Sequence, residues 1–467
     1  MRTHDLVILG GGSGAFSAAI RASELGMTAA IIERGTIGGT CVNVGCVPSK
    51  QLLVTGESYR NALANPFTAL HCEGETLDFA KAIEQKDRVV QELRHEKYED
   101  VLEDLEGVDY VQGNGTFASA HEVKVNGEHL RGQSLLIATG SSPWVPAIPG
   151  LGRTGYWTNV EGLSPEQQPE SLLVIGGRAQ ALEFAQMYAM LGTKVTLLQR
   201  SGRIIPREEP EAAEALTTAL QEDGVEIVTQ AQPIEVRKED GQKVVATKVA
   251  GRSQEFRGAE ILMATGRRPN TAELGLEKIG VELGDRGEVK VDREMRTSVP
   301  HIYAAGDVRG GENLETTAAK EGYIAAENAL AGGHRKMDPP EKVPRAIFTN
   351  PQFAAVGYTE EEFSALRGVC ACRTLPLDLV AKARVVGDTR GMIKMGIDPE
   401  SRVIVGVQIV AAQAAELIHE AALAVKHELT IDDIIDMVHV FPTYSEMLKL
   451  VALSYYRDVS KLSCCTQ

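Results

Sequence analysis

The stretch "DLVILGGGSGAFSAAIRASELGMTAAIIER" at residues 5–34 limits the possible folds more than any other part of the chain. It predicts an apolar strand, a glycine turn, a helix of small residues and a second apolar strand that ends in Glu33. Gly10 and Gly12 let a pyrophosphate approach the helix N-terminus, and Ala15 lets the helix pack closely on the strand. Glu33 is placed to accept hydrogen bonds from a ribose. The combination favours a dinucleotide site over an ordinary turn.

A second, degenerate copy of this pattern follows at residues 172–207, "LLVIGGRAQALEFAQMYAMLGTKVTLLQRSGRIIPR". Gly176 opens its turn, but Arg178 occupies the second glycine position and Ala181 the third. The order of strand, turn, helix and strand is kept. We therefore expect a second dinucleotide-binding unit in the same chain.

The second copy ends differently from the first. Gln199 stands where an acidic residue is expected, and it is followed by Arg200, Arg203 and Arg207. A carboxylate would repel a 2′-phosphate, whereas guanidinium groups bind it through charge-assisted hydrogen bonds, so this end favours NADPH over NADH. The alternative interpretation is a solvated basic loop.

Two cysteines lie in the glycine-punctuated segment "GGTCVNVGCVPSK" at residues 38–50. Cys41 and Cys46 have four residues between them, which can close a small disulfide loop. A helix is expected to begin there, and a helix N-terminus stabilises a thiolate, the reactive form of cysteine. The alternative is a pair of buried structural cysteines. The glycines and the position after the dinucleotide motif favour a redox centre.

Composition excludes several classes of partner. The formal net charge is −16, so electrostatic binding to nucleic acid or to an anionic membrane is not expected. No apolar run approaches the roughly 20 residues that span a bilayer, and we expect a cytoplasmic protein. The seven cysteines include two close pairs, one being Cys464 and Cys465 near the end of the chain. This usage indicates redox or metal chemistry rather than a disulfide framework.

The cysteine segment resembles the signature of the flavin-dependent pyridine nucleotide–disulfide oxidoreductases. Further matching stretches are "LIATGSSP", "ATGRRPN", "TSVPHIYAAGDV" and "PRAIFTNPQFAAVGYTE". The resemblance implies an α/β fold with two Rossmann-like dinucleotide-binding domains and an α+β C-terminal dimerisation domain. The implied domains are an FAD domain at 1–145 and 270–340, an NADPH domain at 146–269 and an interface domain at 341–467 that makes a homodimer.

The resemblance also implies roles for individual residues. Asp307 would bind the ribityl chain of FAD. Lys50 would lie near the flavin ring with Glu183 as its ion-pair partner, and the two would tune the charge of the flavin. Further residues expected to contact FAD are Gly39, Thr40, Thr139 and Gly140.

The C-terminal part decides among the possible substrates. Glutathione reductases and dihydrolipoamide dehydrogenases carry a His-Pro…Glu unit whose histidine gives a proton to the leaving thiol. This chain reads "HVFPTYSEMLKL", with Phe441 before Pro442. Glu446 is kept, but His439 lies two positions early and should point elsewhere. Disulfide reduction would therefore lack its usual acid.

The tail "DVSKLSCC" closely resembles that of the family members that reduce mercuric ion. Thiolates select soft metals, so Cys464 and Cys465 would capture thiol-bound Hg(II) and pass it to Cys41 and Cys46 of the partner subunit. The resemblance implies that NADPH and FAD then supply two electrons, which convert Hg(II) to Hg(0). Cys46 would be the thiol next to the flavin, and Cys41 the exchanging thiol.

The same resemblance assigns Tyr98 to the active site, although a surface aromatic is its default interpretation. A second tyrosine of the family is replaced by Phe441, for which Tyr444 is a candidate substitute. The small N-terminal metal-binding domain with its own Cys-x-x-Cys is not found in this sequence, so we expect the catalytic core alone.

Two other functions stay open. One is a disulfide reductase of the same family, similar to the large thioredoxin reductases or to dihydrolipoamide dehydrogenase. The other is a non-catalytic metal-binding protein on this fold. Cys72, Cys370 and Cys372 are interpreted as incidental. Alternation along a strand would place Cys370 and Cys372 on one face, but no third metal ligand is evident.

Overall fold

The computed structural model of the chain describes residues 2–67, 69–70 and 76–462. These residues form two compact units. The first contains Met1–Ser49, Ile83–Trp144 and Gly266–Pro339, and the second contains Lys50–Ala82, Val145–Thr265 and Pro340–Gln467. The domain limits expected from the sequence stay a prediction.

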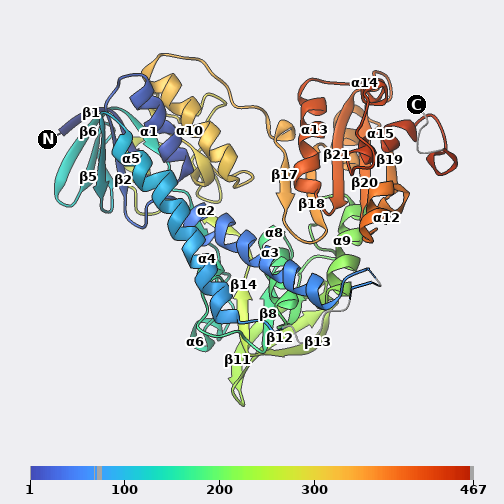
Figure 1. The fold of residues 1–467 in the computed structure, drawn as a ribbon. Helices are drawn as coiled ribbons and strands as arrows, with labels where there is room; N and C mark the ends of the chain where they lie inside the picture. Colours follow the sequence, from blue (N-terminus) through green and yellow to red (C-terminus); the bar gives the residue numbers. More distant parts are fainter. Residues whose placement is uncertain (1, 68, 71–75, 463–467) are drawn as a thin grey trace. The chain divides into compact units, whose positions relative to one another are not determined.

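The first unit is built on a largely parallel sheet (Figure 1). Its strand order is β3-β2-β1-β6-β5-β4, and β16 also pairs with β6. The parallel strands read as continuous apolar runs because helices or loops cover both faces. The strands are β1 (Arg2–Leu9), β2 (Ala29–Glu33), β3 (Val108–Gln112), β4 (Thr116–Ser119), β5 (Glu122–Val125), β6 (Glu128–Ile137) and β16 (Ile302–Ala304). A small antiparallel pair joins β7 (Ser141–Pro143) to β15 (Arg267–Pro269).

Two helices of the first unit, α1 (Ser13–Glu24) and α10 (Glu315–Leu330), cross at very short range. A Cβ atom on Gly322 would lie 1.9 Å from the carbonyl oxygen of Gly14, so this crossing requires glycine. The other helical segments are α2 (Gly39–Val44), α3 (Cys46–Leu63), α4 (Phe79–Arg94), a π-helical turn (His95–Glu99), α5 (Asp100–Asp104) and short 3₁₀ turns at Leu276–Ile279 and Gly306–Arg309. Helices α3 and α4 each contribute residues to both units.

The second unit contains another parallel sheet, in the order β10-β9-β8-β14. Its strands are β8 (Ser171–Ile175), β9 (Lys194–Leu198), β10 (Val225–Val228) and β14 (Glu260–Met263), and its helices are α6 (Leu151–Thr154), α7 (Asn159–Gly162), α8 (Ala179–Met190) and α9 (Pro210–Glu222). An antiparallel sheet of β11 (Ala231–Glu239), β12 (Gln242–Val249) and β13 (Arg252–Gly258) is attached. The second Rossmann-like element expected from the sequence is thus present.

The C-terminal part of the second unit is an antiparallel sheet in the order β17-β18-β21-β20-β19, covered by helices. The strands are β17 (Arg345–Ile347), β18 (Gln352–Gly357), β19 (Ala371–Pro376), β20 (Met392–Ile397) and β21 (Ile404–Ala411). The helices are α11 (Glu360–Arg367), α12 (Ala381–Val386), α13 (Ala414–Lys426), α14 (Ile431–Asp436) and α15 (Glu446–Leu453), with 3₁₀ turns at Pro340–Lys342, Leu377–Leu379 and Val459–Lys461. The predicted α/β class with a C-terminal α+β part is confirmed.

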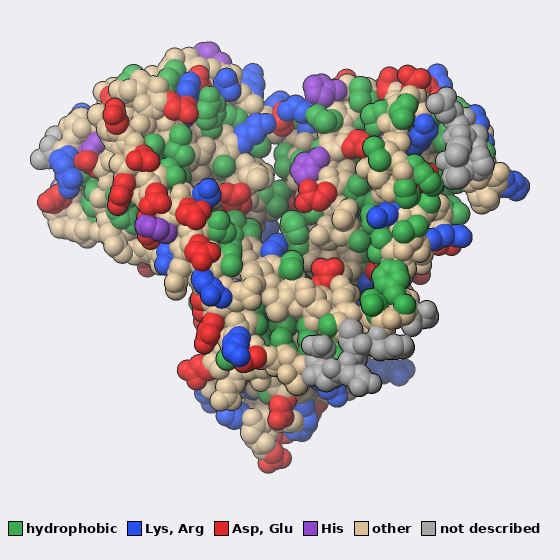
Figure 2. Space-filling model, viewed as in Figure 1, with side chains coloured by type: hydrophobic (Ala, Val, Ile, Leu, Met, Phe, Trp, Pro, Cys, Tyr) green, Lys and Arg blue, Asp and Glu red, His purple; other side chains and the backbone are tan. Residues whose placement is uncertain are grey.

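Figure 2 shows acidic and basic side chains mixed over the visible face of each unit. Within the part of the chain that the structure describes, no helix has the length and apolar character needed to cross a membrane.

Candidate functional site

The first glycine turn forms a close-packed backbone cradle at the N-terminus of α1. Gly10 has φ of +114°, and a Cβ atom there would lie 2.1 Å from the carbonyl oxygen of Ala138. A Cβ on Gly39 would lie 2.8 Å from Cα of Gly12, so the first residue of α2 also lies against this turn. Ala15 is fully buried. The helix N-terminus and the lack of side chains in this turn fit a pyrophosphate.

Glu33 lies at the end of β2, as expected, and its carboxylate already holds the turn together. It accepts hydrogen bonds from the backbone N–H groups of Gly11 at 2.6 Å and Gly35 at 2.5 Å. The side chain remains partly exposed. A cavity of about 490 Å³ begins directly after Glu33. It is lined by the segment that follows β2, including Arg34, and by residues of β3 and α5, including Tyr110.

Asp307 is part of a hydrogen-bonded cluster that the sequence motifs only partly revealed. Its Oδ2 atom accepts a hydrogen bond from Ser141 Oγ at 2.6 Å, and Arg267 Nε lies 3.6 Å away. Arg267 also donates to Ser141 Oγ and to its carbonyl oxygen. Burial lowers the pKa of Arg267, which the negative charges of Asp307 and Cys46 oppose. Arg267 belongs to the "ATGRRPN" stretch, but neither residue type nor spacing alone indicated its contacts.

Thr139 and Gly140 form the loop after β6. Thr139 Oγ1 donates a hydrogen bond to the carbonyl oxygen of Asn270 at 2.8 Å. The N–H of Asn270 in turn donates to the carbonyl oxygen of Gly140 at 3.0 Å. Two segments far apart in the sequence are thereby fixed at this end of the sheet.

The two cysteines of the redox motif lie at the junction of α2 and α3. Cys41 is in α2 and half-buried, whereas Cys46 is the first residue of α3 and exposed. Gly45 makes the tight turn between them possible, because a Cβ there would lie 2.8 Å from the carbonyl oxygen of Thr40. Thr40 is exposed and lies in the first turn of α2.

The thiols of Cys41 and Cys46 interact directly. The pKa of Cys41 is raised above its usual range. The largest cause is its hydrogen bond to Cys46, followed by burial and by the negative charge of Cys46. The proton therefore stays on Cys41. Cys46 sits at the N-terminus of an 18-residue helix, which is the end of a helix dipole that favours a thiolate. The pair can thus hold one negative charge on the sulfur of Cys46.

Tyr98 lies in the π-helical turn and reaches the same region. Its ring packs edge-on against Phe16 with centroids 4.9 Å apart, and its hydroxyl lies 3.4 Å from Ser13 Oγ. Burial raises the pKa of Tyr98, the hydrogen bond with Ser13 lowers it, and the negative charges of Glu315 and Cys46 raise it further. The interpretation as a surface aromatic does not hold, because the side chain faces α1 and the cysteine pair. Helical periodicity could not show this contact.

Lys50 is the fifth residue of α3, and its ammonium group meets a buried carboxylate. Lys50 Nζ lies 2.7 Å from Glu183 Oε2, and the other oxygen of Glu183 accepts a hydrogen bond from the N–H of Phe348 at 2.9 Å. Lys50 Nζ also lies 4.7 Å from the centroid of the Phe348 ring. The carboxylate is therefore fully engaged, and it fixes the lysine side chain.

The second glycine turn repeats the geometry of the first. Gly176 has φ of +141°, and a Cβ there would lie 2.3 Å from the carbonyl oxygen of Ala264. Arg178 is the N-cap residue of α8. Gln199, which replaces the acidic residue, is buried and donates a hydrogen bond to the carbonyl oxygen of Arg203 at 3.1 Å.

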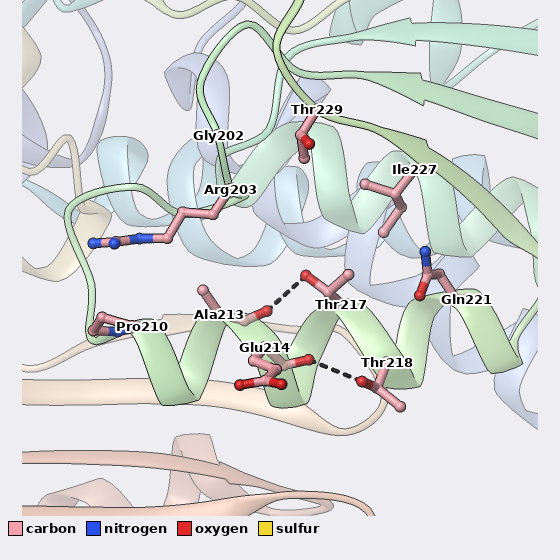
Figure 3. Close-up of a pocket in the computed structure, with 10 residues that line it drawn as sticks. All are labelled: Gly202, Arg203, Pro210, Ala213, Glu214, Thr217, Thr218, Gln221, Ile227 and Thr229. Carbon is pink, nitrogen blue, oxygen red and sulfur yellow. Dashed lines mark hydrogen bonds between the residues drawn. The ribbon is translucent and has the colours of Figure 1, made fainter. Parts of the chain in front are cut away.

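The three arginines after β9 have different surroundings. Arg203 donates from Nη2 to the carbonyl oxygens of Pro206 and Glu208, at 3.1 Å each, and is partly buried. Arg200 and Arg207 are exposed. A cavity of about 430 Å³ lies between this loop and α9, with Arg203 along its wall (Figure 3). Arg203 thus shapes the loop. The sequence could not distinguish it from Arg200 and Arg207, because all three carry the same charge.

In the C-terminal segment, His439, the nearest histidine to the position of the usual proton donor, is held by another contact. His439 Nε2 lies 3.0 Å from Glu420 Oε1, and the histidine side chain is only 5% exposed. Phe441 is 51% exposed. Tyr444, the candidate substitute, is buried, and its hydroxyl lacks a hydrogen-bond partner among the described residues. Burial raises the pKa of Glu446. Cys72, Cys464 and Cys465 lie outside the described residues.

Known proteins share this architecture. The family model "Pyridine nucleotide-disulphide oxidoreductase" matches residues 4–329, and the dimerisation domain of that family matches residues 343–452. The mercuric reductase of Staphylococcus aureus is 42% identical over 99% of this chain and 84% of its own length. The mercuric reductase of Streptomyces lividans is 40% identical over 99% of this chain and 98% of its own.

A solved structure gives the same result for the fold. The Cu(II) complex of the HOCl-induced flavoprotein disulfide reductase RclA from Escherichia coli matches with a TM-score of 0.88 at 28% identity. The match covers 98% of this chain and all of that one. The chain therefore belongs to the pyridine nucleotide-disulphide oxidoreductase family, in the branch that the mercuric reductases occupy.

Proposed function

We propose that this chain is an NADPH- and FAD-dependent enzyme that reduces thiol-bound Hg(II) to Hg(0). The observation that carries the proposal is the interacting pair of Cys41 and Cys46 beside Tyr98, in a chain about 40% identical to several mercuric reductases over nearly its whole length. Two thiolates are a ligand set that selects soft cations.

The residues present fit the two cofactors. Gly10 and Gly39 have no room for side chains in the cradle that they form with Gly12, which suits the pyrophosphate of FAD. Asp307 offers a carboxylate beside Arg267, and the charge of Cys46 also acts on that arginine. The turn at Gly176 suits the pyrophosphate of NADPH in the same way. When bound, the two cofactors supply hydride transfer and a two-electron reductant.

The remaining chemistry belongs to the side chains. Cys41 and Cys46 would hold the ion as a dithiolate, and the hydrogen bond between them keeps the shared proton on Cys41 until the metal replaces it. Tyr98 would support the bound ion with its hydroxyl. Lys50, held by Glu183, would place a positive charge near the reacting centre. Cys464 and Cys465 would deliver the ion.

The choice of NADPH is part of the proposal. Arg200 and Arg207 are exposed after β9, and Gln199 removes the carboxylate that would repel a 2′-phosphate. Because Arg203 already donates to two backbone carbonyls, we assign the direct phosphate contact to Arg200 and Arg207 and the shape of the loop to Arg203.

We also propose that the active enzyme is a homodimer with sites shared between subunits. The family's dimerisation domain is present. Within residues 437–441 it exposes four apolar side chains whose burial against a second copy would be favourable, namely Met437, Val438, Val440 and Phe441. The predicted cytoplasmic location stays a prediction.

A second candidate is disulfide reduction, which the name of the structurally similar RclA favours. Phe441 before Pro442 and the contact of His439 with Glu420 leave that reaction without its usual proton donor.

The test is NADPH oxidation with Hg(II) in excess small thiol, against oxidised glutathione, lipoamide and oxidised thioredoxin. We expect turnover with Hg(II) alone. Faster turnover with any disulfide would replace the proposal with the second candidate.

A further inference from the structure

A second thiol pair lies in the C-terminal part of the chain. The sulfur atoms of Cys370 and Cys372 are 3.0 Å apart. Cys370 directly precedes β19 and Cys372 is within it, so alternation along the strand turns both side chains to the same face. Both are half-buried and both are free thiols. The pair lies at the edge of its sheet, because β19 has β20 as its neighbour on one side only.

The neighbouring strand leaves space for these two sulfur atoms. Gly396 in β20 is the register partner of Cys372. A Cβ atom on Gly396 would lie 3.1 Å from Cys370 Sγ and 3.4 Å from Cys372 Sγ. Both contacts are tighter than ordinary van der Waals distance. The absence of a side chain at this position therefore provides the room in which the thiol pair sits.

A hydrogen bond joins the two thiols. The hydrogen bond between them lowers the pKa of Cys370 and raises that of Cys372. The ammonium group of Lys394 adds a positive charge near both sulfurs, whereas Glu360 opposes it. The hydroxyl of Tyr455 lies within hydrogen-bond distance of the backbone beside the pair, 3.0 Å from the carbonyl oxygen of Ala371 and 2.6 Å from that of Met395.

The number of ligands decides which cation can bind. Among the described residues, no group of three or more His, Cys, Asp or Glu side chains is arranged to hold a metal. Structural Zn(II) needs four such ligands. Thiophilic cations such as Hg(II) and Cu(I) can instead be bound by two thiolates alone. From the sequence alone, Cys370 and Cys372 are interpreted as incidental because they lack a third ligand. Hg(II) and Cu(I) do not need one.

We propose that Cys370 and Cys372 form a separate two-coordinate site for a thiophilic cation, with Hg(II) as the ion it meets in this enzyme. Binding exchanges ligands without any transfer of electrons. Two Hg–S bonds to a small-thiol complex break, two Hg–S bonds to Cys370 and Cys372 form, and the two released small thiolates take up the two protein protons. The site lies apart in sequence from Cys41 and Cys46 and does not depend on their reducing Hg(II).

The test counts bound mercury in the full-length protein without NADPH. The starting variant carries Cys41→Ser, Cys46→Ser, Cys464→Ala and Cys465→Ala, is reduced and desalted without oxygen, and is dialysed with Hg(II) against a small monothiol. We expect one Hg(II) per chain by elemental mass spectrometry. Adding Cys370→Ser or Cys372→Ser should weaken retention by about a hundredfold or more, because the chelate is lost. Adding Cys72→Ser, the matched control, should change nothing.

Two further arms separate this site from general thiol binding. Gly396→Ala keeps both cysteines but fills the space beside them, so it should weaken retention. Cu(I) should compete with Hg(II), whereas Zn(II) should not be retained. Mercury that stays bound after Cys370→Ser, or a starting variant that retains none, would overturn the proposal.

A measurement on the unaltered holoenzyme covers the case in which the multiple variant does not fold. Iodoacetamide labelling is mapped by peptide mass spectrometry with and without Hg(II). We expect Hg(II) to protect Cys370 and Cys372 together and to leave Cys72 reactive. Equal labelling of Cys370 and Cys372 in the two samples would contradict the site, whatever the enzyme's rate of Hg(II) reduction.

Discussion

The Nζ atom of Lys50 lies 2.7 Å from the Oε2 atom of Glu183, whose side chain is only 8% exposed. The second oxygen of Glu183 accepts a hydrogen bond from Phe348, so the carboxylate has partners on both sides. A carboxylate buried to this degree remains charged only when it is paired. The pair therefore fixes the position of the Lys50 ammonium group.

The first prediction concerns this ion pair. Glu183→Gln keeps an acceptor for Phe348 but removes the charge that faces Lys50. We expect flavin reduction by NADPH to slow by about ten- to a hundredfold, the usual effect of losing one charge-assisted hydrogen bond. Stopped-flow absorbance measures this rate. The matched control is Glu166→Gln, an exposed acid of the same unit. A rate equal to that of the control would refute the role of the pair.

The second prediction concerns the choice of cofactor. The unaltered enzyme should have a far higher kcat/KM with NADPH than with NADH. Arg200→Ala should reduce this preference by about ten- to a hundredfold, because a charge-assisted contact with the 2′-phosphate is lost. Arg252→Ala, an exposed arginine of β13, serves as the control. Equal use of NADPH and NADH by the unaltered enzyme would be inconsistent with the assignment.

How much of the site's geometry could be predicted from the sequence depends on the kind of contact. The tight turns at Gly10 and Gly176 could be predicted because a positive φ and a facing carbonyl oxygen exclude any side chain, and this requirement leaves a readable motif; their role in cofactor binding stays a prediction. The roles of Arg203 and Arg267 were not separable from those of nearby arginines. Their hydrogen bonds depend on where loops return in space, and residue type does not encode that.

Tyr98 illustrates the same limit. The sequence placed it on a polar helix, where periodicity predicts a surface residue. In the structure a π-helical turn at His95–Glu99 interrupts the helix and directs the ring onto Phe16. Such turns are common at functional sites but leave no simple sequence pattern. Only the family resemblance indicated that Tyr98 belongs to the site.

The third prediction follows from the position of Tyr98. Tyr98→Phe keeps the edge-on contact with Phe16 and removes the hydroxyl. Reduction of the Cys41–Cys46 disulfide by NADPH should be unchanged, whereas Hg(II) turnover should fall by about tenfold, the effect of one lost polar contact. Tyr456→Phe, at a tyrosine that is 49% exposed, is the control. Loss of both activities, or of neither, would argue against a contact between this hydroxyl and the metal.

The fourth prediction concerns pH. The hydrogen bond to Cys46, together with burial, raises the pKa of Cys41. In the reduced enzyme, alkylation of Cys41 should therefore be slow at neutral pH and should rise only above the usual pKa of a thiol, since the thiolate is the reactive form. Cys46→Ser removes the largest cause of the shift, so the rise should move to lower pH. Peptide mass mapping across pH measures both curves, with Cys72→Ser as the control. Coincident curves for the unaltered enzyme and Cys46→Ser would contradict the direct interaction.

The fifth prediction separates the two cysteine pairs of the proposed mechanism. Replacing Cys464 and Cys465 by Ala should leave NADPH reduction of the Cys41–Cys46 disulfide intact and should impair turnover of Hg(II) bound to bulky thiols. Small Hg(II) complexes should be affected less. If the tail acts on the neighbouring subunit, mixing this variant with Cys41→Ala should restore one working site per heterodimer. Activity no greater than either parent, with heterodimers shown to be present, would exclude action in trans.

The most direct test of the central claim compares the Hg(0) released with the NADPH oxidised. The enzyme is supplied with Hg(II) in excess small thiol, and mercury vapour and NADPH absorbance are followed together. The account predicts one Hg(0) for each NADPH, and no Hg(0) from Cys41→Ala or Cys46→Ala protein. NADPH oxidation without mercury vapour, or vapour released at the unaltered rate by Cys41→Ala protein, would contradict it.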